Sequence, residues 1–178
     1  MVEAAFEKQN YSEPKEYGGF WLRFGAYLID GIIVGIPIGI ITTIIFVVFL
    51  GTSDSVMSSF TDPAYMESGE MTEAETIDFI SRYFGALLLT LLIGTVIAVA
   101  YFAGMHASKW QATLGKKLVG LKVTDLQGNR ITFWRALGRY MAQAFLSQIL
   151  LIGYILAAFT ERKQALHDMI AGTVVVRN

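Results

Sequence analysis

Apolar residues are concentrated in three long runs that are separated by polar stretches. The first run, Gly31–Leu50, has no charged residue and is long enough to cross a hydrocarbon core of about 30 Å. The helical pattern extends back to Trp21, which predicts one helix at about 21–50. Pro37 lies inside this helix and provides a place where it can kink, because proline removes one backbone donor.

The second run, Tyr83–Ala103, is interrupted by little except two threonines. Ahead of it, Thr72 and Glu75 have the spacing of a capping box, in which each side chain accepts from the other residue's backbone N–H. This spacing predicts that the helix begins near Glu73, outside the membrane. The membrane-spanning part of the helix is expected at about 78–104.

The loop at about 105–132 has a pattern that is typical of strands. Leu118–Asp125 alternates apolar and polar residues, and turn residues separate it from Arg130–Thr132, so we expect a small β-hairpin here. A second strand-like piece closes the chain at 172–177. Because a lone strand leaves its backbone groups unpaired, we expect Val174–Val176 to pair with the first strand of the hairpin.

The third apolar segment, at about 133–160, is less uniform than the other two. Four polar residues recur in it at four-residue spacing and mark one helical face: Arg135, Arg139, Gln143 and Ser147. Full crossing would place the terminal strand on the opposite side from its partner. We therefore favour a segment that enters the membrane and returns, broken near Gly153, and a plain third span is the alternative.

Charge distribution predicts how the chain is oriented. Residues 51–81 contain seven acids and no lysine or arginine, whereas residues 104–139 contain seven basic residues and one acid. Basic residues are retained in the cytoplasm, so we expect an acidic outer loop at 51–77 and a basic cytoplasmic loop. The tail at 1–17 is also expected in the cytoplasm, followed by a membrane domain at 18–178. This orientation describes a multi-pass protein of the plasma membrane.

Composition supports the same fold class and excludes several functions. Of the 178 residues, 54% are hydrophobic and 16% are charged, which is hard to reconcile with a soluble surface. There is no cysteine, only two histidines, and a net charge of −1. We therefore expect no cofactor, no metal site and no nucleic-acid partner. The patterns together predict an all-α integral membrane protein with two transmembrane helices, a third re-entrant or spanning segment and a small cytoplasmic β-element.

Three charged residues are candidates for ion or proton binding. Asp30 falls about a third of the way into the bilayer, where a carboxylate is costly and is expected to face protein or water. It either binds an ion or proton, or it is a satisfied buried acid that fixes helix packing. Arg23 leans toward the cytoplasmic surface, away from Asp30, and we expect it to meet Asp168 there. Asp30 would then be free to take up a proton. For His167, a structural role is favoured over a metal-dependent catalytic one.

Small residues on the first helix predict close helix packing. Gly31, Gly35 and Gly39 recur at four-residue spacing, which lets two helix backbones approach closely in a membrane. The face formed by these glycines fits an internal contact or a contact between subunits. We expect a homo-oligomer, since one chain is too small to enclose a path.

Three stretches of the sequence resemble the RDD family. They are the helix motif Arg23–Asp30, the cytoplasmic motif Thr113–Val123 and the closing motif Leu166–Val176, in the family's order over about residues 18–177. The residues that give this family its name correspond to Arg23, Asp30 and Asp168. The resemblance implies a bacterial-type membrane protein with a transport-related role, such as cation–proton exchange, or a membrane assembly module.

Two functions are therefore expected from the sequence. The first is movement of a cation or a proton-coupled small solute through the bilayer, with Asp30 as the binding carboxylate and the acidic loop concentrating cations. The alternative is an assembly or binding module without transport activity. The chain has no recognisable pair of nucleophile and base, so it is not expected to be an enzyme.

Overall fold

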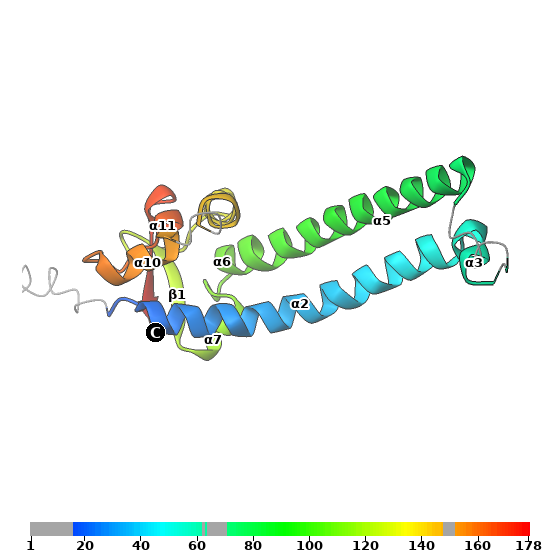
Figure 1. Ribbon diagram of the computed structural model, residues 1–178. Helices are drawn as coiled ribbons and strands as arrows, with labels where there is room; N and C mark the ends of the chain where they lie inside the picture. The colour runs from blue at the N-terminus through cyan, green and yellow to red at the C-terminus, as the bar shows by residue number, and fades with distance from the viewer. Residues whose placement is uncertain (1–15, 62, 64–70, 148–151) are drawn as a thin grey trace, which may run out of the picture. The chain divides into compact units, whose positions relative to one another are not determined.

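The computed structural model describes residues 16–61, 63, 71–147 and 152–178 (Figure 1). The remaining residues include most of the expected cytoplasmic tail and part of the expected acidic loop, so those predictions lie outside the described residues. The chain forms two compact units. We call Ile32–Ala98 the hairpin unit, and the residues up to Gly31 together with Val99–Asn178 the sheet unit.

The hairpin unit contains most of the two long helices. α2 is Phe20–Gly51, of which Ile32 onward belongs to this unit, and it runs without interruption through Pro37. α3 is Asp54–Thr61, and α5 is Glu73–Val99. Phe46 packs on Tyr83, which places the end of α2 beside the start of α5, as in an antiparallel hairpin.

The start of α5 follows from its capping residues. The Thr72 backbone N–H donates to the Glu75 carboxylate at 2.8 Å, and the Glu75 N–H donates to Thr72 Oγ1 at 3.3 Å. Both bonds of the predicted capping box are therefore present, and they satisfy two backbone donors at the helix terminus. The prediction that this helix begins near Glu73 is confirmed.

Both long helices expose apolar side chains. Two helices of the described chain, Phe20–Gly51 and Glu73–Ala107, are long and apolar enough to span a membrane. On α2, isoleucines at four-residue spacing are more than half exposed: Ile32, Ile36, Ile40 and Ile44. In water such a surface would be strongly unfavourable, whereas lipid tails solvate it well. The structure has the form expected of an integral membrane protein with two spanning helices.

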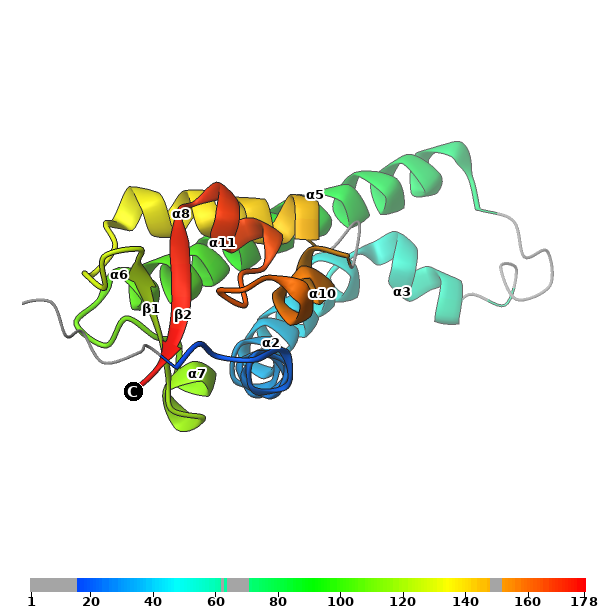
Figure 2. The ribbon, with the colours of Figure 1, turned by 90° about the vertical axis from the view of Figure 1, so that its left-hand side faces the viewer.

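The sheet unit is built from short elements, whose paths can be followed in Figure 2. The spanning helix ends as η1, a π-helical turn at Ala100–Gly104, and α6, Met105–Ala107. The following elements are α7 (Leu114–Leu118), β1 (Leu121–Asp125), α8 (Phe133–Ala142), η2 (Gln143–Ser147), α10 (Ile152–Phe159), α11 (Leu166–Ile170) and β2 (Thr173–Arg177).

β1 and β2 pair antiparallel, as Figure 2 shows. Val174–Val176 lie opposite Lys122–Thr124, so the predicted pairing of the terminal strand is confirmed. Leu121, Val123 and Val175 are fully buried and form the core of this unit. Residues 16–18 run beside β2, where Gly18 N donates to Val175 O at 2.9 Å.

The predicted hairpin partner, Arg130–Thr132, is wrong, because these residues form no strand. The Asp125 carboxylate accepts from the backbone N–H of Asn129 at 2.7 Å and closes a turn. Thr132 then becomes the N-cap of α8, with its hydroxyl accepting from Arg135 N at 3.3 Å. A residue committed to starting a helix cannot extend a strand, so β1 pairs with β2 instead.

The third apolar segment folds back on itself. α10 packs against η2, and α11 packs against both α8 and α10. Among the described residues it forms no continuous helix of membrane-spanning length. Gly153, where a break was expected, lies in the first turn of α10. A segment that enters the membrane and returns to the same side requires such a reversal.

Candidate functional site

Two buried carboxylates in the sheet unit bring together the three sequence stretches singled out above. Asp30, near the end of the α2 portion that belongs to this unit, is 2% exposed. Asp168, in α11, is fully buried. Each is surrounded by groups from other elements, and the two sets of partners differ in charge.

Asp30 is held by three neutral donors. The Tyr101 hydroxyl donates to Oδ1 at 2.6 Å, and the Thr113 hydroxyl donates to Oδ2 at 2.6 Å. The backbone N–H of Gly115 adds a third bond to Oδ1, at 2.7 Å. Asp30 makes no ion pair with any other described residue. Its carboxylate is therefore satisfied by hydrogen bonds alone.

The local sequence around α7 explains this arrangement. Thr113 caps α7 through its side chain, which accepts from Lys116 N, and so its hydroxyl lies beside the first turn. A Cβ atom at Gly115 would lie 2.3 Å from the Ala26 backbone oxygen and 2.8 Å from the Asp30 side chain. Only glycine allows α7 to approach α2 this closely, because the obstruction is backbone. Tyr101 reaches Asp30 from the π-helical turn η1.

Asp168 is held by two arginines. Arg139 donates to Oδ1 through Nε at 2.9 Å and through Nη2 at 2.6 Å, and Arg23 donates to Oδ2 through Nη1. The Ala165 backbone N–H also donates to Oδ2, at 3.2 Å. The predicted meeting of Arg23 and Asp168 is present. The sequence-based site did not include Arg139, although the polar stripe contained it.

The Arg23 guanidinium is also tied to the backbone on both sides of the ion pair. Its Nε donates to Gly18 O at 2.8 Å, and its Nη2 donates to Lys163 O at 2.6 Å. A guanidinium has five donors in a fixed planar fork, and this geometry suits several acceptors at once. Arg23 thereby joins the first helix to the segment that precedes α11.

Electrostatics fix the charge state of the Asp168 site. Burial favours the neutral acid, but the charges of Arg139 and Arg23 outweigh it and hold the pKa of Asp168 well below its usual range. Burial disfavours the charged form of the neighbouring imidazole and lowers the pKa of His167 to about 3. Near neutral pH, Asp168 is therefore ionised and His167 is neutral. The site holds a carboxylate fixed by two cations, with no proton to give.

A second polar pair was missed by sequence reasoning. Lys116 Nζ lies 2.8 Å from His106 Nε2, and His106 is 1% exposed. Burial, reinforced by the charge of Arg139, holds the pKa of Lys116 well below its usual range. Among the described residues, His106 Nδ1 and Arg139 Nη1 have no hydrogen-bond partner. Nothing in the spacing of these residues along the chain signals that they meet.

The described acids and histidines are not grouped as metal ligands would be. The described part of the chain holds no group of three or more His, Cys, Asp or Glu side chains that could bind a metal ion.

The predicted packing glycines of α2 have free space around them. A Cβ added at Gly31, Gly35 or Gly39 would meet no atom within 4 Å. The glycine face is therefore open with respect to the described residues.

Comparisons with known proteins give relatives but no assigned activity. The chain is 42% identical to the uncharacterized protein YxaI of Bacillus subtilis (strain 168) over 158 residues, covering 89% of this chain and 95% of that protein. It is 31% identical to the uncharacterized membrane protein YteJ of the same organism, covering 96% of this chain and 91% of that protein. No solved structure matches the chain.

The family comparison spans nearly the whole described chain. The model of the RDD family matches residues 17–172, a range that includes Arg23, Asp30 and Asp168. Two apolar helices of spanning length are consistent with the description of YteJ as a membrane protein. The protein is a membrane protein and belongs to the RDD family.

Proposed function

We propose that the protein moves protons and a small cation across the plasma membrane, with Asp30 as the carboxylate that takes up one or the other. The observation that carries this proposal is the contrast between the two buried acids. Asp168 is paired with Arg23 and Arg139, whereas Asp30 is held by neutral donors only. Asp30 can therefore change its proton or ion occupancy without breaking an ion pair.

The groups around Asp30 suit both occupants. Hydroxyl oxygens are acceptors as well as donors, so the Tyr101 and Thr113 oxygens can turn lone pairs toward a cation when their hydrogens rotate away. Carboxylate and hydroxyl oxygens are ligands that hard cations prefer. Ionisable residues buried in membrane proteins commonly mark ion or proton pathways. Their burial costs free energy, so they are rare where no function requires them.

Transport by this site requires more than one chain. From Gly31 to Gly51 and from Tyr83 to Ala103 the two helices contain no Asp, Glu, Lys, Arg or His. One chain thus offers no charged route beyond Asp30. We place the route between copies in a homo-oligomer that packs through Gly31, Gly35 and Gly39, whose surface is open.

The proposal includes an orientation. Lys and Arg predominate in the sheet unit, while the described residues that join α2 to α5 are acidic or neutral. The sheet unit and the N-terminus then face the cytoplasm, and the loop joining the long helices faces out. Cations gathered outside by the acidic loop would reach Asp30 near the cytoplasmic side.

The test is ion flux in vesicles that contain the purified protein. A pH gradient is imposed, sodium or potassium is added, and the internal pH is followed with a trapped dye. We expect the wild type to dissipate the gradient on cation addition and Asp30→Asn to lose this activity. Glu161→Gln, which removes an exposed acid outside the acidic loop, is the matched control and should retain it. Full activity in Asp30→Asn would contradict the proposal.

A second candidate function is a binding module that organises other membrane proteins. It is favoured by the three bonds that make Asp30 a clamp joining α2 to η1 and to the start of α7. This reading predicts no cation-dependent flux in the wild type. It also predicts that Gly35→Leu, which fills the open glycine face, weakens association measured by cross-linking in lipid.

A further inference from the structure

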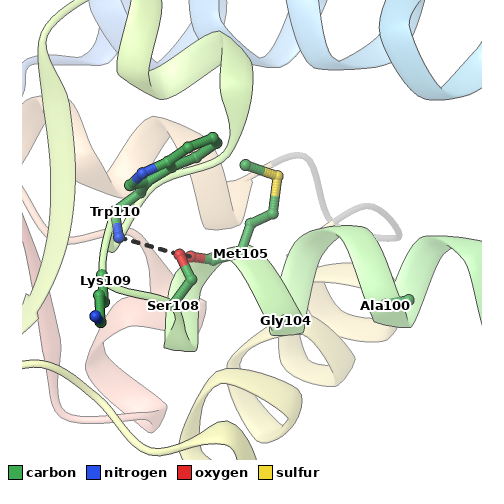
Figure 3. Close-up of a pocket in the computed structure, with 6 residues that line it drawn as sticks. All are labelled: Ala100, Gly104, Met105, Ser108, Lys109 and Trp110. Carbon is green, nitrogen blue, oxygen red and sulfur yellow. Dashed lines mark hydrogen bonds between the residues drawn. The ribbon is translucent and has the colours of Figure 1, made fainter.

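An open groove lies at the end of the second spanning helix, within the sheet unit. Figure 3 shows its six lining residues: Ala100, Gly104, Met105, Ser108, Lys109 and Trp110. Its volume is about 490 Å³. Figure 3 also shows the Met105 and Trp110 side chains extending to the same side of the helix end. The groove is separate from the contacts of Asp30 and Asp168 described above.

One side of the groove is apolar and small. Ala100 and Gly104 belong to the π-helical turn η1, and Met105 follows them. A Cβ at Gly104 would meet no atom within 4 Å, so the groove has room for a larger side chain at this residue. This side continues the apolar surface of a membrane-spanning helix, whose surroundings are acyl chains.

The other side of the groove is basic and aromatic. Lys117 Nζ lies 3.6 Å from the centre of the Trp110 ring, a cation–π contact, and Lys109 precedes Trp110 with its side chain exposed. The Ser108 hydroxyl donates to Met105 O at 2.7 Å and accepts from Trp110 N at 3.1 Å, as Figure 3 shows for the second bond. These bonds hold Trp110 beside the helix end, next to Lys109 in the chain and in contact with Lys117, which itself does not line the groove.

The three tryptophans place this side at a membrane surface. All three lie in the sheet unit and are exposed: Trp21 by 76%, Trp110 by 53% and Trp134 by 77%. Exposed tryptophan is unfavourable in water but is enriched where the acyl region meets the head groups. The groove therefore changes from apolar to basic near the membrane surface. A phospholipid changes from acyl chain to head group at the same depth.

We propose that this groove binds one anionic phospholipid. Its acyl chain lies along Ala100, Gly104 and Met105, and its phosphate group meets Lys109 and Lys117 beside Trp110. A soluble phosphate would use only the basic side, and a neutral lipid only the apolar side. An anionic phospholipid matches both, because anionic head groups attract basic residues at about 1 kcal/mol each.

The experiment reads the fluorescence of Trp110 alone. Trp21→Phe and Trp134→Phe remove the two other tryptophans, which both lie outside the groove. The full-length protein in detergent micelles is titrated with phosphatidylglycerol or phosphatidylcholine that carries bromine on an acyl chain, which quenches nearby indole. We expect phosphatidylglycerol to quench at a lower mole fraction. Lys109→Gln should raise its half-quenching fraction about fivefold, the factor that corresponds to about 1 kcal/mol.

Two further variants separate the parts of the groove. Arg162→Gln removes an exposed positive charge outside the groove and should leave quenching unchanged. Gly104→Leu fills the groove and should weaken quenching by both lipids, because the acyl chain is displaced. Equal quenching by both lipids, unaffected by Lys109→Gln, would overturn the proposal. Displacement of phosphatidylglycerol by soluble glycerol phosphate would also overturn it, since the site would then recognise phosphate without a lipid. None of these outcomes depends on ion transport.

Discussion

The two acids of the sheet unit differ in what their neighbours allow them to do. Asp168 neutralises two arginines, of which Arg139 is 1% exposed and would be left uncompensated without it. Asp30 makes no salt bridge with a described residue and accepts three hydrogen bonds. Replacing each by the isosteric amide therefore has different consequences, because an amide keeps the shape and removes the charge.

Asp168→Asn is expected to destabilise the protein far more than Asp30→Asn. Removing one partner of a buried ion pair costs about 3–5 kcal/mol. In Asp30→Asn the amide oxygen keeps the bonds from Tyr101 and Gly115, and Thr113 can accept from the new NH₂ group, at a cost of about 1 kcal/mol. Thermal unfolding of both variants in the same detergent measures the difference. Equal losses of melting temperature would make Asp30 a structural acid.

His167 is expected to make the protein less stable in mild acid. Its pKa is about 3 in the folded state against 6.5 for an ordinary histidine, so between these values the unfolded chain binds a proton that the folded chain does not. The stabilisation is complete above the higher value and is lost as the pH falls toward the lower one, by up to about 1.4 kcal/mol per pH unit. His167→Gln should flatten the fall in melting temperature between about pH 6 and about pH 4. An unchanged slope would contradict this.

At the scale of elements, the Asp30 clamp depends on how closely α7 approaches α2. Gly115 is the residue that permits it, since any side chain there would collide with the Ala26 backbone oxygen. The N-cap residue Thr113 and the π-helical turn η1 bring the other two donors to the same carboxylate. Three elements thus converge on one acid at the end of a spanning helix.

Gly115→Ala is expected to destabilise the sheet unit by about 1–3 kcal/mol, because backbone must move to admit the methyl group. Gly25→Ala is the control: it lies next to Ala26 in α2 and has room for a methyl group, so it should cost nothing or stabilise slightly. Thermal unfolding of the two variants provides the comparison. A melting temperature for Gly115→Ala as high as that of Gly25→Ala would show that α7 does not pack as described.

The elements that the sequence predicts well are those whose cause is local. The capping box at Thr72 and Glu75 fixes where α5 begins, and the strand-like sequences of β1 and β2 leave each strand needing a partner. The hairpin prediction failed because Thr132 serves a helix cap, which competes with strand extension. The contact between Lys116 and His106 could not be predicted, since it depends on tertiary folding of the loop.

At the scale of the whole molecule, the proposed transport by Asp30 requires a defined orientation of the chain in the membrane. The described residues of the basic sheet unit include Glu16 and Asn178, so the proposed orientation would put these two residues and the loop near Trp110 on the cytoplasmic side. The reversal of the third apolar segment between α8 and α11 agrees with this, because β2 must return to pair with β1.

Cysteine accessibility in intact cells tests the orientation. The chain has no native cysteine, so a single cysteine at Asn178 or at Ser58 gives an unambiguous signal. A membrane-impermeant thiol reagent should label the cysteine at Ser58 and leave the one at Asn178 unlabelled until the cells are opened. Equal labelling of both in intact cells would mean that the third segment crosses the membrane.

The proposal that Asp30 takes up a proton or a cation while Asp168 stays paired with its arginines is tested most directly by infrared difference spectroscopy. The protein in lipid is moved at constant pH between buffers with and without sodium or potassium, and the change in the carboxyl stretches is recorded. We expect a band that is absent in Asp30→Asn. A spectrum in which Asp30→Asn retains every band of the wild type would contradict it.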